Sequence, residues 1–261
     1  MTYKFSINST YFILAIFNFF SLSAQIDYKF NAEVMVESYL NAKYNYQTKE
    51  FVWKPSKKEI EDFGVSDDGY LYSKIHDIYS YGGNFKTIVI DTYIKNDEGY
   101  IYSCHSCSPF FGLLTFKVSK DNETTENIYF ERLIGQYGEY GKPGKIGILQ
   151  ITNKDYCIKV DNSVYNTGTF EKTTYLYYEG KFVLEYITES SYEGSPSLSH
   201  SYKTNVKVDK INGVITLVKK GTEYNETKGK VIAVNKTLKY KFTEITKAWH
   251  RKGFVLLKSN K

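Results

Sequence analysis

Short runs of alternating apolar and polar residues, separated by glycine-bearing turns, constrain the fold of this chain more than any other feature. The runs are rich in tyrosine and β-branched residues, which favour half-buried strands. Dipeptides such as Asn212-Gly213 and Lys252-Gly253 mark turns between them. The candidate strands are residues 51–53, 87–94, 100–103, 113–118, 128–133, 146–151, 156–160, 173–178, 182–187, 205–208, 214–218, 231–234, 238–245 and 254–257. The pattern predicts a mainly β fold, with antiparallel meander, sandwich or barrel-like sheets.

Helical periodicity is confined to the region before these strands. Apolar residues recur there at helical spacing, with Asn31 available as N-cap, which predicts one amphipathic helix over residues 32–43. The residues at this spacing are Ala32, Met35, Val36, Tyr39, Leu40 and Lys43. Ser56 followed by Glu59 forms a capping box, which predicts a brief second helix over residues 57–63.

A seven-residue segment at residues 67–73, Asp-Asp-Gly-Tyr-Leu-Tyr-Ser, recurs almost unchanged at residues 97–103. An acidic residue and glycine followed by alternating aromatic and aliphatic residues are typical of a tight turn entering a strand. The spaced aspartate series of a calcium-binding loop is missing from both copies. We therefore interpret each copy of the repeat as a tight turn that leads into a strand.

The first residues have the pattern of a secretory signal. Lys4 supplies a positive charge, residues 11–20 are apolar, and small residues come next, up to Ala24. The apolar run is about half the length that a membrane span requires. We expect a signal peptide over residues 1–24, cleaved near Ala24, and a single β-rich exported domain over residues 25–261. The mature protein would be periplasmic or secreted, with no membrane span.

Charge and aromatic content narrow the classes of partner. The chain has 34 basic and 29 acidic side chains, and the lysines are scattered among acids and tyrosines. This balance is typical of a solvated surface and argues against nucleic-acid binding. The 26 tyrosines suit half-buried strand positions, although they would also suit a carbohydrate or peptide groove.

The glycine-rich run at residues 135–144 offers two candidate binding residues, Tyr137 and Tyr140. The alternative is a rigid connection between two strands, which the density of glycine favours.

The segment Cys104-His105-Ser106-Cys107 is the best candidate site. The segment does not match a haem-attachment motif, because that motif needs histidine directly after the second cysteine and Ser108 stands there. A thioredoxin-type dithiol needs the motif to open a helix, which Pro109 disfavours. A metal site remains open: Cys104, His105, Cys107 and Cys157 would supply ligands to zinc, with His76 or His200 as further candidates for the fourth position.

A structural disulfide between Cys104 and Cys107 is the preferred interpretation in an oxidising compartment. Cys157 lies in a strand whose alternation places it on the face opposite Ile158. Cys157 would reach the Cys104–Cys107 segment only if its strand neighbours the hairpin that carries this segment. Because the chain has three cysteines, any single disulfide leaves one free thiol. We expect no cofactor, except zinc if the cysteines form a metal site.

No hydrolase motif stands out in the chain. The sequence lacks a Gly-x-Ser-x-Gly elbow, a His-Glu-x-x-His motif and a phosphate-cradling glycine loop. Acidic residues are plentiful, but sequence alone does not locate a carboxylate pair for glycoside chemistry.

The cysteine segment and the residues after it resemble a group of exported bacterial proteins of unknown function. Those proteins carry a Cys-His-x-Cys segment, a hydrophobic strand and a Gly-x-aromatic-Gly-x-Pro loop. The resemblance covers roughly residues 86–187 and implies export and a β fold without implying a reaction. The matching residues here are Cys104, His105, Cys107, the run 112–118, Gly138, Tyr140, Gly141 and Pro143. Tyr140 stands where tryptophan is expected.

We therefore expect a non-enzymatic binding or interaction protein with a protein partner, in an immunity-type or envelope-associated role. The alternative is a metal-binding or redox protein that uses Cys104, His105 and Cys107. A third possibility is a carbohydrate-binding module that uses tyrosine side chains as platforms.

Overall fold

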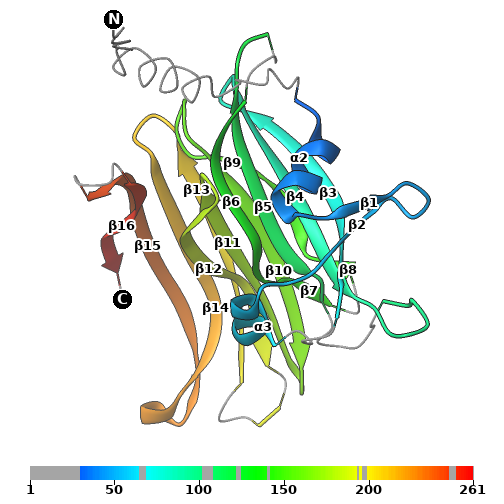
Figure 1. Cartoon of the computed structure of the whole chain (residues 1–261). Helices are drawn as coiled ribbons and strands as arrows, with labels where there is room; N and C mark the ends of the chain where they lie inside the picture. The colour runs from blue at the N-terminus through cyan, green and yellow to red at the C-terminus, as the bar shows by residue number, and fades with distance from the viewer. Residues whose placement is uncertain are drawn as a thin grey trace, which may run out of the picture.

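The computed structural model describes residues 30–64, 69–101, 108–121, 125–139, 142–192, 194–195, 199–246 and 251–260. Over these residues the protein is mainly β, as the alternating runs predict, and its sheets are antiparallel meanders (Figure 1). The first sheet has six strands in sequence order: β1 (Lys43–Asn45), β2 (Glu50–Trp53), β3 (Leu71–Tyr81), β4 (Phe85–Ile94), β5 (Phe110–Val118) and β6 (Thr125–Gln136).

The second sheet has eight strands, also in sequence order. They are β9 (Lys145–Gln150), β10 (Tyr156–Asn166), β11 (Thr169–Tyr178), β12 (Lys181–Tyr192), β13 (His200–Asp209), β14 (Val214–Asn225), β15 (Lys230–Thr246) and β16 (Arg251–Asn260). Between the two sheets, the glycine-rich run forms a small hairpin of β7 (Gly138–Glu139) and β8 (Lys142–Pro143), which confirms that it connects two strands.

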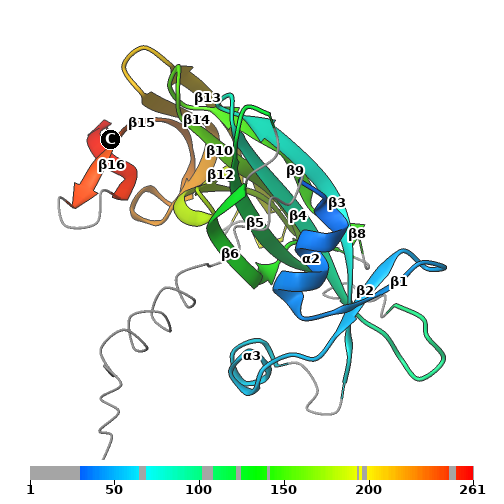
Figure 2. The same cartoon turned by 45° about the horizontal axis from the view of Figure 1, so that its top comes forward.

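The N-terminal helix α2 (Ala32–Leu40) covers the outer face of the six-stranded sheet (Figure 2). Its Asn31 cap accepts a hydrogen bond from the backbone N–H of Val34 at 3.1 Å, as predicted. The helix ends three residues earlier than predicted, because Asn41 adopts a left-handed conformation that leads into β1. The shorter helix α3 (Lys57–Phe63) has the predicted capping box.

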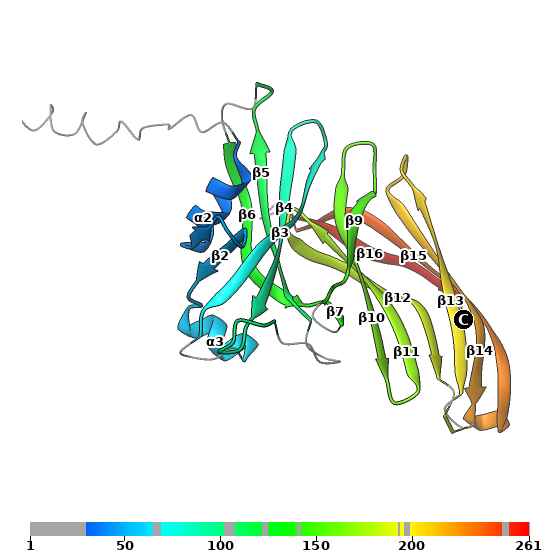
Figure 3. The ribbon, with the colours of Figure 1, turned by 90° about the vertical axis from the view of Figure 1, so that its right-hand side faces the viewer.

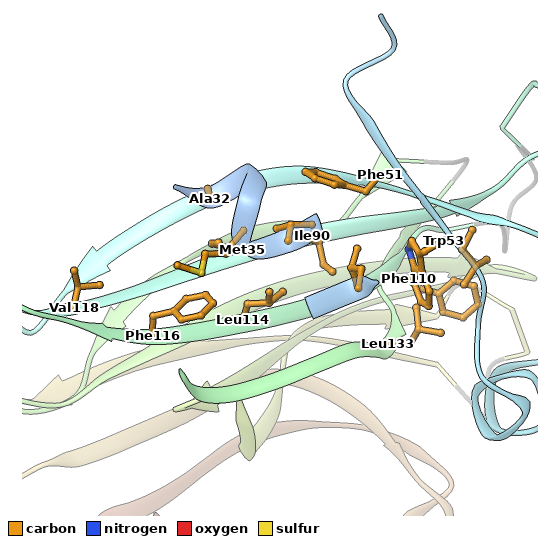
Figure 4. Packing of buried hydrophobic residues seen from close by; sticks show 14 residues of the cluster. Ala32, Met35, Phe51, Trp53, Ile90, Phe110, Leu114, Phe116, Val118 and Leu133 are labelled. Carbon is orange, nitrogen blue, oxygen red and sulfur yellow. The ribbon is translucent and has the colours of Figure 1, made fainter. Parts of the chain in front are cut away.

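A dense apolar core lies between α2 and the sheet beneath it (Figure 4). Met35 and Val36 of the helix pack over Ile90 and Leu114 of the strands, while Trp53 lies at one end of the same core. The indole N–H of Trp53 donates to the Ser73 hydroxyl at 2.8 Å, so its polar atom is satisfied where it is buried.

The opposite face of the six-stranded sheet packs against β9–β12. Val89 and Leu113 of the first sheet meet Ile158, Val160 and Tyr177 of the second in a common buried cluster. Strands β9–β12 are therefore apolar on both faces, as is expected for the middle layer of three.

The eight-stranded sheet folds back on itself between β12 and β13. These two strands pair over only four residue pairs, from Glu189–Lys203 to Tyr192–His200. A register shift opposite Lys172 and Thr173 bends β12 just before that point. Beyond the bend, β13–β16 lie over β9–β12 as a third layer, and β16 contacts β12 (Figure 3). We call the short β12–β13 pairing the hinge.

Apolar and polar contacts join the two halves of the folded sheet. Leu176 and Leu184 of the middle layer pack against Leu217 and Phe242 of the third layer. In the turn between β9 and β10, the Asp155 carboxylate accepts hydrogen bonds from Lys252 of β16 at 2.7 Å and from the Tyr178 hydroxyl at 2.9 Å. Burial alone would raise the pKa of Asp155, but these hydrogen bonds hold it below its ordinary value.

Most predicted strands are confirmed, and the differences concern β1, β3, β15 and the hinge. Strand β1 was not predicted, and it begins where the helix was predicted to end. Strand β3 continues to Tyr81, a stretch that the pattern did not predict. Residues 231–234 and 238–245 belong to one long strand, β15, instead of two. The polar stretch from Ser190 to Ser201 lies outside the candidate strands, yet its two ends extend β12 and β13 through the hinge. These strand ends are rich in serine, so their sequence shows no apolar alternation that would predict a strand.

The second copy of the seven-residue repeat begins as a turn, as predicted. Gly99 has a φ of 83°, which favours glycine, and the residue after Tyr100 forms an isolated bridge to Lys95. The rest of that predicted strand lies outside the described residues. Within the described part of the chain, neither helix is long and apolar enough to cross a bilayer.

Candidate functional site

Most of the predicted cysteine site lies outside the described residues. Cys104, His105 and Cys107, and the candidate binding residue Tyr140, all belong to this undescribed part. The Cys104–Cys107 disulfide and the zinc alternative therefore stay predictions.

Cys157 is described and lies in the core between the two halves of the folded sheet. Its side chain is 1% exposed and carries no disulfide. The predicted alternation holds, because Cys157 faces this core while Ile158 faces the first sheet. Its strand neighbours β9 and β11 of the second sheet. Burial raises the pKa of the thiol, which opposes the thiolate form that zinc requires.

The two described histidines proposed as metal ligands lie in different sheets. His76 is the extra residue of a bulge in β3, and its Nδ1 is 2.7 Å from the Asp91 carboxylate. His200 begins β13 at the hinge. Among the described residues, no group of three or more His, Cys, Asp or Glu side chains is arranged to hold a metal ion.

Tyr137, the other candidate binding residue, packs between the sheets. Its ring contacts those of Phe111 and Tyr175, with centroids 5.7 and 4.8 Å apart, and its hydroxyl is hydrogen-bonded to that of Tyr177. Burial raises the pKa of Tyr137, so the hydroxyl stays protonated as a hydrogen-bonding group. These contacts give it a structural role in the inter-sheet core.

The structure shows a groove that sequence reasoning missed. It lies between the two halves of the folded sheet, next to the hinge, and has a volume of about 200 Å³. We call it the hinge groove. It is lined by Glu185, Tyr186 and Ile187 of β12, Tyr202 and Thr204 of β13, Leu217 and Lys219 of β14, and Lys236, Leu238 and Tyr240 of β15.

Two lysines stand side by side in the wall of the hinge groove. Lys219 and Lys236 are directly opposed partners in the β14–β15 ladder, so their side chains project from the same face. Like charges in this position destabilise a sheet. Among the described ion pairs of the molecule none involves either lysine, although Glu185 lies in the opposite wall. The wall therefore carries concentrated positive charge.

Tyrosines complete the polar character of the groove. The Nζ atom of Lys219 lies 3.4 Å from the ring centroid of Tyr202, which holds the ammonium group by a cation–π contact. Burial raises the pKa of Tyr186 to about 12 and also raises that of Tyr202. Both hydroxyls are therefore protonated at neutral pH, and each already has a hydrogen-bond partner, Thr174 for Tyr186 and Ser190 for Tyr202.

The hinge itself holds a serine–histidine pair. The Ser190 hydroxyl and the His200 Nε2 atom are 2.8 Å apart, and the imidazole ring stacks between Tyr192 and Tyr202. This is the spacing of a nucleophile and its base. Ser190 is only 2% exposed, however, so a substrate does not reach its hydroxyl in this conformation. The pair instead ties β12 to β13 beside the groove.

The hinge groove is suited to binding an anionic group. It combines two lysines that take part in no described ion pair with the hydroxyl groups of Thr204 and Tyr240, and its lining also includes Ile187, Leu217 and Leu238. The part of the chain that the structure describes places no accessible nucleophile–base pair in it. Its volume is below the 300–1,000 Å³ of ordinary small-molecule pockets. The groove therefore fits an acidic side chain better than a whole cofactor.

Comparisons of the chain with protein-family models, with curated proteins and with solved structures found no match.

Proposed function

We propose that this is an exported, non-enzymatic binding protein that captures an acidic segment of a protein partner in the hinge groove. The opposed lysines Lys219 and Lys236 carry the proposal. Their mutual repulsion is a cost to the folded sheet that an acidic ligand would relieve. An immunity-type or envelope-associated inhibitor role agrees with a binding site of this kind.

The lining of the groove supports a protein ligand. An acidic side chain would enter between the lysines, while Tyr240 offers a flat apolar face with a polar tip for the flanking atoms. Tyrosine is enriched where proteins bind one another, because it buries a large area with few rotatable bonds.

The proposal is tested with a fluorescein-labelled peptide that carries consecutive glutamates, titrated with the mature protein while anisotropy is recorded. The variant Lys219→Gln/Lys236→Gln removes the positive charge of the groove. We expect its affinity to fall by about a hundredfold or more, because two charged contacts are lost and each contributes about 1.5–3 kcal/mol.

The matched control is Lys203→Gln/Lys220→Gln. These lysines are likewise directly opposed, in the β13–β14 ladder, but project from the other face of the sheet. The control should bind the peptide within about twofold of the native protein. Equal losses in both variants would show a response to net charge alone, and no binding by the native protein would refute the acidic-segment proposal.

The alternative role for Cys104, His105 and Cys107 as a metal or redox site stays a prediction. Elemental analysis and mass spectrometry of the alkylated protein test it directly. Stoichiometric zinc that is lost together with the fold on chelation would support a metal site. A mass showing two thiols inaccessible to alkylation until reduction would support the disulfide instead.

A further inference from the structure

The positive charge of the chain is concentrated in its third layer. Residues 200–261 contain fifteen lysine or arginine residues and four aspartate or glutamate residues, whereas residues 1–199 contain nineteen basic and twenty-five acidic ones. The net charge of the whole chain, +5, is therefore the sum of a strongly basic C-terminal part and an acidic remainder. Figure 3 shows this layer, β13–β16, on the side of the molecule opposite α2.

Four lysines project from the outer face of this layer. Lys203 opposes Lys220 across the β13–β14 ladder, and both Lys207 and Lys239 are partners of Thr216. Directly opposed residues share a face, and residues four apart in one strand also share it. All four lysines are exposed, whereas the alternating residues Tyr202, Thr204 and Val206 face inward. We call Lys203, Lys207, Lys220 and Lys239 the lysine face.

The lysine face is continuous and almost free of acids. Neither the β13–β14 nor the β14–β15 ladder contains a register shift, so no bulge interrupts it. Lys203 is paired with Glu189 at the rim, at 2.9 Å, and Asp209 at one end accepts hydrogen bonds from Asn212. Lys207, Lys220 and Lys239 take part in none of the ion pairs found among the described residues.

We infer that the lysine face docks the protein onto an anionic phospholipid surface. Its composition disfavours a protein partner, because protein interfaces are depleted of lysine and enriched in aromatic residues and arginine. The side chains between the lysines are the short Asn205, Thr216, Val218 and Thr237. Long ammonium side chains above these short ones match lipid headgroups, and the charge asymmetry orients the molecule as it approaches.

An exposed apolar side chain stands at the edge of the same layer. Ile211, in the turn between β13 and β14, is 86% exposed. Placed next to the lysine face, it would enter the headgroup region once the lysines have docked.

The test is cosedimentation of the mature protein with vesicles made of equal amounts of phosphatidylglycerol and phosphatidylcholine, compared with vesicles of phosphatidylcholine alone. We expect binding only to the anionic vesicles, weakening as salt is added. Replacing all four lysines of the face by glutamine should lower vesicle affinity by several hundredfold (about 600-fold), since each lysine near such a surface contributes roughly fivefold. Replacing them by arginine should preserve binding.

The matched control replaces four exposed lysines of the first sheet and its surroundings, Lys43, Lys57, Lys117 and Lys120, by glutamine. It makes the same change in net charge and should leave vesicle binding nearly unchanged. Equal losses in both variants, or binding of soluble polyglutamate without any binding of vesicles, would overturn the inference. The groove variant Lys219→Gln/Lys236→Gln should bind vesicles normally. The vesicle test of the lysine face and the peptide test of the hinge groove can therefore fail independently of each other.

Discussion

At the scale of single residues, the His76–Asp91 pair makes the stability of the first sheet depend on pH. Asp91 is 5% exposed, and its hydrogen bond raises the pKa of His76 above the ordinary 6.5. Because the pKa of His76 is higher in the folded state than in the unfolded state, the pair stabilises the fold fully at a pH below the unfolded-state pKa. This stabilisation is lost as the pH rises through the folded-state pKa.

We expect His76→Gln to lower the free energy of unfolding by about 1–2 kcal/mol at about pH 5.5, and by clearly less at about pH 9. Urea denaturation of both proteins at the two pH values measures the difference. A cost that is larger at high pH would contradict the assigned charge on His76.

Cys157 gives a second prediction at the residue scale. Because its thiol is buried among apolar side chains, iodoacetamide should leave it unmodified in the native protein and should alkylate it in denaturant. Cys157→Ser would place a hydroxyl in that core and should cost about 1–3 kcal/mol. Peptide mass mapping and thermal unfolding are the measurements, and rapid alkylation of native Cys157 would show that the core is open.

At the scale of elements, one glycine allows β5 to pack closely against its neighbours. A Cβ atom at Gly112 would lie 2.4 Å from the carbonyl oxygen of Arg132 and 2.7 Å from a side-chain carbon of Ile90. Gly112 also lies at the register shift between β5 and β6, where the regular pairing of the two strands is interrupted.

We expect Gly112→Ala to destabilise the protein by about 1–3 kcal/mol through overpacking. Gly147→Ala in β9 is the control, because no atom lies within 4 Å of the Cβ position there. That substitution should be neutral or stabilising by up to about 1 kcal/mol. Similar midpoints of chemical denaturation for the two variants would contradict the packing described for β5.

The same scale shows what the sequence could predict. The alternation that separates Cys157 from Ile158 is local, and the capping box of Ser56 and Glu59 is also local, so both were predicted correctly. Strand β15 was divided in two, because the polar pair Asn235 and Lys236 interrupts its apolar pattern. Strand ends rich in serine, such as the hinge, carry no apolar signal at all.

At the scale of the whole molecule, the arrangement of the layers depends on contacts between residues distant in sequence. Lys219 and Lys236 are seventeen positions apart and meet only through the β14–β15 register. The groove needs, in addition, the bend at the hinge that brings Tyr186 over the third layer. Neither the register nor the bend leaves a recognisable local pattern, so the sequence placed the candidate site at the cysteine segment instead.

The layered arrangement also separates the two proposed surfaces. Along β14, Lys219 points into the hinge groove and Lys220 points out to the lysine face. If both proposals hold, this one strand would serve an acidic protein segment on one side and an anionic lipid surface on the other. Docking through the outer face would leave the groove free to bind its partner.

Binding of an acidic segment between Lys219 and Lys236 is best tested by observing the lysines themselves. Reductive ¹³C-methylation labels every lysine and preserves its charge, so that NMR reports on each ammonium group separately. On addition of the glutamate peptide, we expect the signals of Lys219 and Lys236 to shift together and saturably, while those of Lys203 and Lys207 stay in place. Shifts spread evenly over the lysines, or confined to the outer face, would contradict binding in the hinge groove.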